Sequence, residues 1–366
     1  MNQYVRELKK IVENYENFQQ NEDLKQQLYA LYSLIDHDLK DDEKLPIKAA
    51  DVVGTIITKF FNPATIHDAI KTGFPQIDRT IVGFQKGEFI VIGGRPGMGK
   101  TQLMVQLATN IAEQKIAIAY FSLEFNTEIL TQKLLANLAQ VSPETFARPG
   151  EYNNQIEEKL SYAIKQLKEM PIYFYENPST HINKLIKLIT NLVLEKNVKV
   201  VFIDYLQLIS IGSRRINRDV EMSIICRELK RLAKELEITL IVGSQLSRQV
   251  ENRPGGSRRP QLSDLRESGS IEQDADKVFL LYRPEYYGLE IDENNQTTIN
   301  KMEIMLSKNR SGPLWDFMVT ALFSKSIIVD IEDYEDKRYI KSSEINISSD
   351  RLKDFDDPTN NTNDVF

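Results

Sequence analysis

One glycine-rich segment constrains this chain more than any other feature of its sequence. Residues 94–101 read Gly-Arg-Pro-Gly-Met-Gly-Lys-Thr and match the pattern G-x-x-x-x-G-K-S/T in full. The apolar run Phe89–Ile92 precedes this segment, and a helical pattern follows it over residues 100–113. Glycines in this context let the backbone wrap around phosphate oxygens, and the following helix points its positive end at the same charge. The segment therefore predicts a phosphate-binding loop.

Alternating strand and helix patterns surround this loop and indicate an α/β fold with a mostly parallel sheet flanked by helices. Short runs rich in β-branched residues predict strands at Phe89–Ile92, Ile116–Phe121, Ile172–Tyr175, Val198–Ile203, Thr239–Val242, Val278–Leu281 and Met302–Leu306. Helices are expected at about residues 100–113, 126–140, 153–169, 180–196 and 217–236. Residues 318–331 predict later, antiparallel strands.

The sequence divides into three regions by pattern. Residues 1–69 carry apolar side chains at three- and four-residue steps, which predicts a small helical N-terminal region that includes a helix over Val52–Phe61. The α/β pattern occupies residues 70–341. Residues 342–366 are polar and acidic, which is typical of a disordered tail.

Composition excludes several classes of protein. No apolar run approaches the roughly 18 residues that span a bilayer, and the start of the chain lacks the apolar stretch of a signal peptide. We therefore expect a cytoplasmic protein with no membrane partner. The single cysteine, Cys226, excludes intramolecular disulfides, and three histidines far apart in sequence do not suggest a zinc site.

The distribution of charge limits where nucleic acid could bind. The formal net charge is −7. Residues 331–366 hold ten acidic and five basic side chains, so this segment alone contributes −5. The rest of the chain is therefore close to neutral and has no general basic coat. Any nucleic-acid surface must be local.

The phosphate-binding loop and one later strand predict a site for a nucleoside triphosphate and Mg²⁺. Lys100 would neutralise the β- and γ-phosphates, and the Thr101 hydroxyl would ligate the metal ion. The apolar run 199–203 delivers Asp204 to the carboxyl end of its strand, where parallel sheets bind ligands. Asp204 would complete the magnesium shell. The predicted nucleotide contacts are Gly94, Arg95, Pro96, Gly97, Met98, Gly99, Lys100, Thr101 and Gln102.

Two further features have more than one interpretation. Glu124 follows the strand pattern 116–121 and could orient and deprotonate an attacking water, or it could be a helix N-terminal charge. The aromatic segment Tyr282–Tyr287 could stack on an adenine or form an exposed strand end. Spacing alone does not choose between these possibilities.

Seven motifs in a fixed order carry a specific resemblance. They are Thr72-Gly73-Phe74, Gly94–Thr101, Ser122-Leu123-Glu124, Ile203–Leu208, Ser244–Arg248, Asp264–Asp276 and Lys308–Pro313. Together they resemble the C-terminal ATPase domain of the DnaB-type replicative DNA helicases, a RecA-fold family. The likeness covers roughly residues 70–335 and implies a RecA-like P-loop ATPase core.

The resemblance implies roles that spacing left open. Glu124 matches the glutamate that activates the hydrolytic water in that family. Gln245 matches the residue that couples the state of the γ-phosphate to the DNA-binding loops. Lys308 and Arg310 match the basic pair that enters the nucleotide site of the neighbouring subunit. The family therefore implies a ring, expected to be a hexamer, with ATP and Mg²⁺ bound between subunits.

Two basic segments follow strands that end at the predicted nucleotide site. In a ring they would face the central channel and contact the phosphates of single-stranded DNA. The few aromatic residues there predict backbone tracking with little base reading. The predicted DNA contacts are Arg214, Arg215, Arg218, Arg248, Arg253, Arg258 and Arg259.

The N-terminal region departs from the family pattern. Members carry a globular helical domain of about one hundred residues joined by a linker helix, whereas about 70 residues precede the ATPase pattern here. A loader or primase partner is therefore an open expectation. The predicted function is an ATP-dependent DNA helicase of DNA replication. The alternatives are a RecA-like DNA-dependent ATPase without unwinding activity and a non-motor protein that interacts with a helicase.

Overall fold

The chain separates into two units, Met1–Ile66 and His67–Phe366. A computed structural model describes residues 47–61, 69–148, 150, 153–178, 180–212, 216–253, 258–265 and 268–331. In the first unit the described part holds the helix α3 (Ala49–Phe61), where the sequence predicts a helix over Val52–Phe61. The predicted helices before residue 47 and the predicted tail 342–366 lie outside the described residues.

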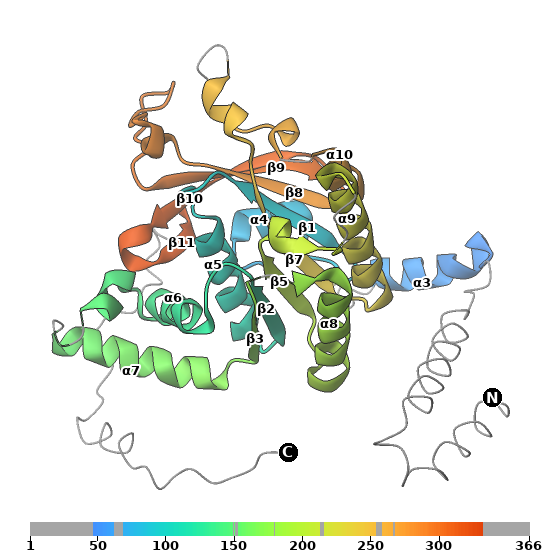
Figure 1. Ribbon diagram of the computed structural model, residues 1–366, viewed down its shortest axis with the longest axis horizontal. Helices are drawn as coiled ribbons and strands as arrows, with labels where there is room; N and C mark the ends of the chain where they lie inside the picture. Colours follow the sequence, from blue (N-terminus) through green and yellow to red (C-terminus); the bar gives the residue numbers. More distant parts are fainter. Residues whose placement is uncertain are drawn as a thin grey trace, which may run out of the picture. The chain divides into compact units, whose positions relative to one another are not determined.

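The described part of the second unit is built on one mixed sheet of nine strands (Figure 1). Their order across the sheet is β11-β10-β9-β8-β1-β7-β5-β2-β3. The strands from β8 to β3 in this order run parallel, whereas β9, β10 and β11 pair in antiparallel fashion. Their bounds are β1 Phe89–Gly94, β2 Ile118–Ser122, β3 Ile172–Glu176, β5 Val200–Asp204, β7 Thr239–Gln245, β8 Lys277–Tyr282, β9 Lys301–Asn309, β10 Trp315–Leu322 and β11 Ile327–Asp330.

Helices cover both faces of the sheet because its central strands are apolar on both sides. Alternate residues of β1 join two separate cores. Ile90 and Ile92 pack in the core that contains α5 (Lys100–Glu113) and α6 (Thr127–Ala139). Phe89 and Val91 pack in the core that contains α8 (Ile182–Lys196) and α9 (Arg218–Glu235), on the other side of the sheet (Figure 1).

The predicted α/β fold class is confirmed, and the elements that were not predicted are mainly short. All seven predicted strands and five predicted helices are present, as are the two later antiparallel strands. The fifth of these predicted helices, after α5, α6, α8 and α9, is α7 (Asn154–Glu169). The elements not predicted are α4 Pro75–Ile81, α10 Ser268–Asp274, and the two-residue strands β4 Thr180–His181 and β6 Ile209–Ser210. Segments this short span too few residues to show a period.

Short 3₁₀ helices join several of these elements. They are η3 Pro143–Ala147, η4 Leu206–Leu208, η5 Arg248–Asn252, η6 Leu262–Asp264, η7 Pro284–Tyr287 and η8 Phe323–Lys325. Among the described helices, none combines the length and the hydropathy that crossing a bilayer requires.

Strand register decides which loops meet. Gly94, the last residue of β1, pairs with Gln245 at the end of β7, and Ser122 at the end of β2 pairs with Asp204 at the end of β5. Because these strands are parallel, their carboxyl ends lie at one edge of the sheet. The segments that follow β1, β2, β5 and β7 therefore leave from the same edge.

A buried ion pair gives a test of this packing. Lys277 in β8 is 1% exposed, and its ammonium group binds the carboxylate of Glu88, which is also buried. We predict that Glu88→Ala lowers the free energy of unfolding by about 3–5 kcal/mol, since a buried ammonium would lose its partner. Urea denaturation followed by circular dichroism measures this change.

The double variant Glu88→Leu with Lys277→Met is the matched control. Apolar side chains in place of a buried pair are often neutral, so the double variant should recover most of the lost stability. A double variant as unstable as Glu88→Ala would contradict the prediction.

Candidate active site

The glycine-rich loop has the backbone conformation that its glycines allow. Gly97 and Gly99 have φ angles of +80° and +91°. A Cβ atom at Gly97 would lie 2.9 Å from the ring of Tyr286, and one at Gly99 would lie 2.8 Å from Phe323. Gly99 is the N-cap of α5, which begins at Lys100, and it has no side chain that could cap the first N–H groups of the helix. This leaves a concave backbone surface suited to an anion.

Three polar side chains meet beside this loop. The Thr101 hydroxyl donates a hydrogen bond of 2.8 Å to Oδ2 of Asp204, and the Tyr120 hydroxyl donates one of 3.2 Å to the same oxygen. The Lys100 ammonium lies 4.5 Å from the ring centroid of Tyr205. Asp204 is 1% exposed, and its other oxygen, Oδ1, has no hydrogen-bond partner among the described residues.

This arrangement fits a hard divalent cation such as Mg²⁺. Hydroxyl and carboxylate oxygens are the ligands that Mg²⁺ takes, and it usually keeps one or two protein ligands with the rest from phosphate and water. A buried carboxylate oxygen without a partner is costly, so a ligand is expected there. In the described part of the chain no three His, Cys, Asp or Glu residues cluster to form another metal site.

Burial and mutual repulsion set the electrostatics of the site. Burial lowers the pKa of Lys100, and the carboxylates of Asp204 and Glu124 oppose that shift. Burial raises the pKa of Glu124, and the charge of Asp204 raises it further, whereas Lys100 and Lys133 lower it. Glu124 therefore belongs to the same charge cluster as Lys100 and Asp204. A raised pKa makes its carboxylate a better proton acceptor.

The structure also weighs against the alternative interpretation of Glu124 as a helix N-terminal charge. Helix α6 begins at Thr127, and its N-cap is Asn126, whose side chain accepts a hydrogen bond of 2.8 Å from the Ile129 N–H. The acidic residue of the first turn is Glu128. Glu124 lies outside the helix, between the end of β2 and this cap.

The side chains of two predicted nucleotide contacts, Arg95 and Gln102, already have partners within the protein. The Arg95 guanidinium binds Glu251 at 2.9 Å and donates a hydrogen bond of 3.0 Å to the Leu246 carbonyl. The Gln102 amide donates a hydrogen bond of 2.5 Å to the Ser326 carbonyl. Protein groups therefore hold both side chains. Only the backbone of these two residues remains for a phosphate.

Gln245 lies beside the loop, next to a residue that was not predicted. Its backbone N–H donates a 3.3 Å hydrogen bond to the amide oxygen of Gln207, whose own amide nitrogen donates a 3.0 Å bond to the Ser244 hydroxyl. Gln207 thus joins the segments after β5 and β7. It lies three residues after Asp204, and this spacing was the signal that could have identified it.

The segment Tyr282–Tyr287 also reaches the loop. Arg283 donates a 3.0 Å hydrogen bond to the Gly97 carbonyl, and its guanidinium lies 4.0 Å from the ring centroid of Phe323. Tyr286 is half exposed and lies against Gly97. Phe323 was not predicted, because it comes from a distant turn.

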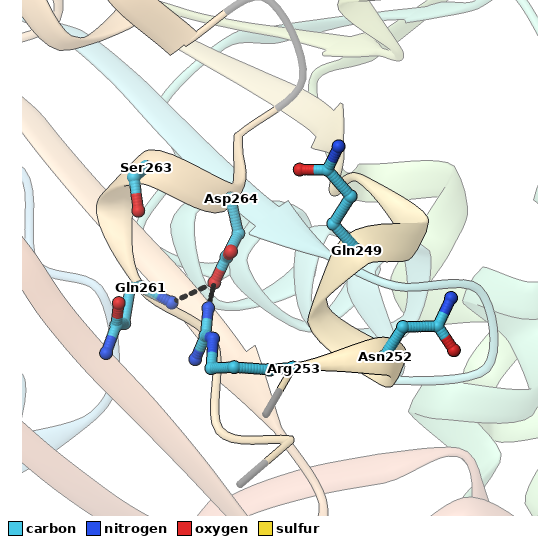
Figure 2. Close-up of a pocket in the computed structure, with 6 residues that line it drawn as sticks. All are labelled: Gln249, Asn252, Arg253, Gln261, Ser263 and Asp264. Atoms are coloured by element: carbon cyan, nitrogen blue, oxygen red, sulfur yellow. Dashed lines mark hydrogen bonds and ion pairs between the residues drawn. The ribbon is translucent and has the colours of Figure 1, made fainter. Parts of the chain in front are cut away.

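Several of the predicted DNA contacts are bound within the protein. Arg253 pairs with Asp264 (Figure 2). It also donates a hydrogen bond of 2.9 Å to the Arg259 carbonyl. Arg259 pairs with Glu303 at 2.8 Å and with Asp316 at 2.6 Å. Acidic groups therefore neutralise two of the charges of the predicted basic segment after β7. That Arg253 and Arg259 contact DNA stays a prediction.

In the segment after β5, a predicted DNA-contacting arginine is also bound within the protein. Arg218 pairs with Glu221 at 2.5 Å and donates a 2.8 Å hydrogen bond to the Gln207 carbonyl. This guanidinium therefore braces the start of α9. Arg214 and Arg215 lie outside the described residues.

Arg248 and Arg258 remain exposed at this edge. The Arg258 guanidinium lies 5.0 Å from the ring centroid of Tyr287. A polar pocket of about 340 Å³ lies beside η5. Figure 2 shows its lining side chains, which come from the two ends of the segment that follows β7. Its lining residues are Gln249, Asn252, Arg253, Gln261, Ser263 and Asp264.

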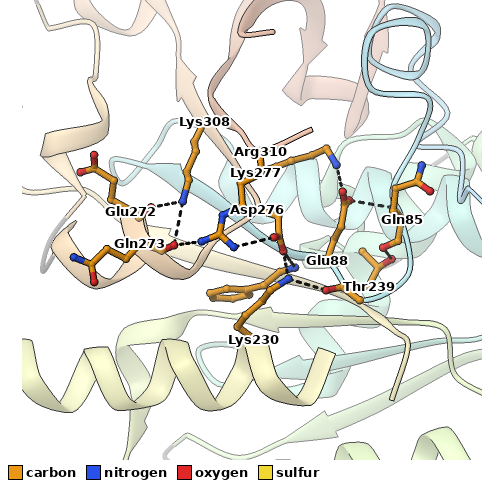
Figure 3. A network of polar contacts seen from close by, with 12 residues as sticks. Gln85, Glu88, Lys230, Thr239, Glu272, Gln273, Asp276, Lys277, Lys308 and Arg310 are labelled. Atoms are coloured by element: carbon orange, nitrogen blue, oxygen red, sulfur yellow. Dashed lines mark hydrogen bonds and ion pairs between the residues drawn. The ribbon is translucent and has the colours of Figure 1, made fainter. Parts of the chain in front are cut away.

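The predicted basic pair lies elsewhere. Lys308 donates hydrogen bonds to the carbonyls of Glu272 and Gln273 at the end of α10, and Arg310 contacts Asp276 at 3.4 Å and the Gln273 carbonyl (Figure 3). Burial and the charge of Arg310 lower the pKa of Lys308.

This position is at the opposite edge of the sheet from the glycine-rich loop. Lys308 pairs with Val278 near the start of β8, a strand parallel to β1. The glycine-rich loop follows the other end of β1. Lys308 and Arg310 therefore do not reach the phosphate-binding loop of their own chain.

The comparisons with known proteins agree with this geometry. The profile of the DnaB-like helicase C-terminal domain matches residues 69–328. The chain belongs to this family. The match includes the glycine-rich loop, Asp204 and the basic pair.

Relatives of the chain are named as replicative DNA helicases. A probable replicative DNA helicase of Trieres chinensis is 40% identical over 259 residues, which are 70% of this chain and 56% of the relative. The replicative DNA helicase DnaB of Geobacillus stearothermophilus is 37% identical over 74% of this chain and 58% of its own length. The chain thus spans about half the length of the curated relatives it matches.

Two solved structures have the same fold. A DnaB-like replicative helicase, studied with its interactions with primase, superposes with a TM-score of 0.75 at 26% identity and covers 90% of this chain and 76% of its own. A second structure, of an ATPase domain, superposes with a TM-score of 0.68 at 29% identity, over 76% of this chain and 98% of its own.

A glycine in β7 gives a test of the site. A Cβ atom at Gly243 would lie 3.1 Å from Oδ1 of Asp204, 3.2 Å from the Met104 sulfur and 3.3 Å from Cε of Lys100. We predict that Gly243→Ala weakens binding of magnesium and ATP together by about tenfold, equivalent to about 1.4 kcal/mol, because these groups must shift. Titration with a fluorescent ATP analogue measures the affinity.

Gly54→Ala is the control, since among the described residues no atom outside the neighbouring backbone of α3 lies within 4 Å of a Cβ at Gly54, and the residue belongs to the first unit. Equal affinity in the two variants would show that the space around Asp204 does not determine binding.

Proposed function

We propose that this protein is an ATP-dependent DNA helicase of the DnaB type, which uses ATP and Mg²⁺ to move on single-stranded DNA and unwind duplex during replication. One observation carries the proposal. Lys100, Thr101, Asp204 and Glu124 converge at one edge of the sheet, and the basic pair that would complete the site lies at the opposite edge.

The residues at the first edge have the groups that hydrolysis of a phosphoanhydride needs. Lys100 and the N–H groups of the loop bind the phosphates. Thr101 and Asp204 would hold Mg²⁺, which neutralises negative charge on the β- and γ-phosphates when bound. Glu124 accepts the proton of the attacking water, and its raised pKa suits that role.

The separation of the two halves supports assembly in a ring. Arg310 can act only on the nucleotide of a second copy, where a guanidinium stabilises charge on the transferred phosphoryl group and typically contributes about 10³–10⁵ in rate. A heterologous contact that repeats around a closed ring supplies such a site at every interface. We propose a hexamer, as the family resemblance implies.

The segments after β5 and β7 are the proposed DNA contacts. Both leave from the edge that holds the nucleotide site, and Arg248 and Arg258 are exposed there. Arg214 and Arg215 belong to the same proposed surface. Phosphate contacts of this kind track a strand without reading its sequence.

A primase or a loader is a further proposed partner. The solved helicase that resembles this chain is described with its interactions with primase. We propose residues 1–69 as the region for such contacts and the cytoplasm as the place of action.

The test of the function is strand separation. The wild type should separate a forked DNA substrate in the presence of ATP and Mg²⁺, and Lys100→Ala should lose ATP hydrolysis by at least about 100-fold, because Lys100 supplies the ammonium that faces the phosphates. Lys196→Ala, at an exposed site at the end of α8, should behave as wild type. Hydrolysis by the wild type without strand separation would favour a DNA-dependent ATPase.

The shared site makes a second prediction. Arg310→Ala subunits retain their own phosphate-binding loop but supply no guanidinium, and Glu124→Gln subunits supply the guanidinium but cannot activate water. Each variant alone should hydrolyse ATP at a small fraction of the wild-type rate. A mixture of equal amounts should recover activity at about one interface in four by random assembly. Full activity of Arg310→Ala alone would exclude catalysis between subunits.

A further inference from the structure

An ion pair joins the glycine-rich loop to the segment after β7. Nε and Nη2 of Arg95 lie 3.0 Å and 2.9 Å from the same oxygen of Glu251, and Nη1 donates a hydrogen bond of 3.0 Å to the Leu246 carbonyl. Arg95 is 9% exposed, whereas the Glu251 side chain is 42% exposed. One partner is therefore fixed in the loop that binds phosphate, and the other is open to solvent.

Glu251 lies in the part of the chain proposed to contact DNA. It belongs to η5, which also carries the exposed Arg248 and ends before Arg253. Gln249 and Asn252 of the same helix line the polar pocket in Figure 2. An anion that approaches η5 would attract Arg248 and repel the carboxylate of Glu251.

A second contact ties the far end of this segment to the same loop. Arg258 stacks over Tyr287, and Tyr287 packs edge-on against Tyr286 with ring centroids 5.4 Å apart. Tyr286 in turn lies against Gly97. The segment that follows β7 thus contacts the glycine-rich loop directly through Glu251 and indirectly through the two tyrosines.

We infer that the Arg95–Glu251 ion pair is a coupling element, through which DNA bound at η5 acts on the glycine-rich loop and the nucleotide bound there. This inference rests on the proposed function, because it assumes that the segment after β7 contacts DNA. It is separate from Gln245, whose backbone N–H bonds to Gln207.

Linkage gives the inference a quantitative form. If ATP changes the affinity for DNA by some factor, then DNA changes the affinity for ATP by the same factor. If an ion pair carries this coupling, its removal should move the factor toward one, while each ligand alone still binds. A pair with a purely structural role would change the affinities or the stability and leave the factor as it is.

The experiment measures the affinity of the full chain for fluorescein-labelled oligothymidylate with and without a non-hydrolysable ATP analogue and Mg²⁺. The wild type should show a coupling factor of about 5–150, the usual range for allosteric proteins. Glu251→Gln should reduce that factor at least about threefold toward one, with the affinity for the analogue alone and the melting temperature retained. Glu251→Asp, which keeps the charge on a shorter side chain, should give an intermediate factor.

Glu303→Gln is the matched control. It makes the same change of charge and removes one of the two acidic partners of Arg259, an arginine of the same segment. The ion pair of Glu303 is with Arg259 rather than with the glycine-rich loop. Its coupling factor should equal that of the wild type. A wild-type factor retained in Glu251→Gln, or an equal loss in both variants, would overturn the inference.

The wild type alone tests the proposed function in the same experiment. A wild type that does not bind the oligonucleotide, or binds it with a factor of one, would overturn the proposed function together with the inference. A coupled wild type with an unchanged Glu251→Gln variant overturns only the inference.

Discussion

Parallel pairing of β1, β7, β5 and β2 is the constraint on which the rest of this structure depends. Parallel strands place their carboxyl ends at one edge, so their last residues all lie there: Gly94, Gln245, Asp204 and Ser122. The helix after β1 then begins at the phosphate-binding loop, and Thr101 in its first turn reaches Asp204 at 2.8 Å. Without this register, residues separated by 103 positions in sequence would not form one site.

The change to antiparallel pairing at β9 has the opposite effect. It turns the chain back, so Lys308 and Arg310 finish at the amino ends of the parallel strands and bind α10 and Asp276. One fold thus presents a phosphate-binding half at one edge and a basic half at the other. The two halves can meet only between copies, which is the physical reason for proposing a site shared in a ring.

Acidic partners decide which basic residues remain available. Asp264 binds Arg253, and Glu221 binds Arg218. Arg259 pairs with both Glu303 and Asp316. Arg95 is held by Glu251. Counting arginines in a loop therefore overstates its positive charge, and the same ion pairs give the loops a defined shape at the edge where nucleotide and DNA are proposed to meet.

The sequence by itself determined the fold class, the phosphate-binding loop and the order of the strands along the chain, because these depend on local patterns: glycine spacing, β-branched runs and helical periodicity. The end of an apolar strand pattern also pointed to Asp204 as a metal ligand, whereas the role predicted for Glu124 came from the family resemblance, because spacing left it open. Only the tertiary structure decided the side-chain contacts of Arg95, Gln102, Gln207 and Phe323. These depend on partners far away in sequence, and no local pattern encodes which distant carboxylate or carbonyl a side chain will meet.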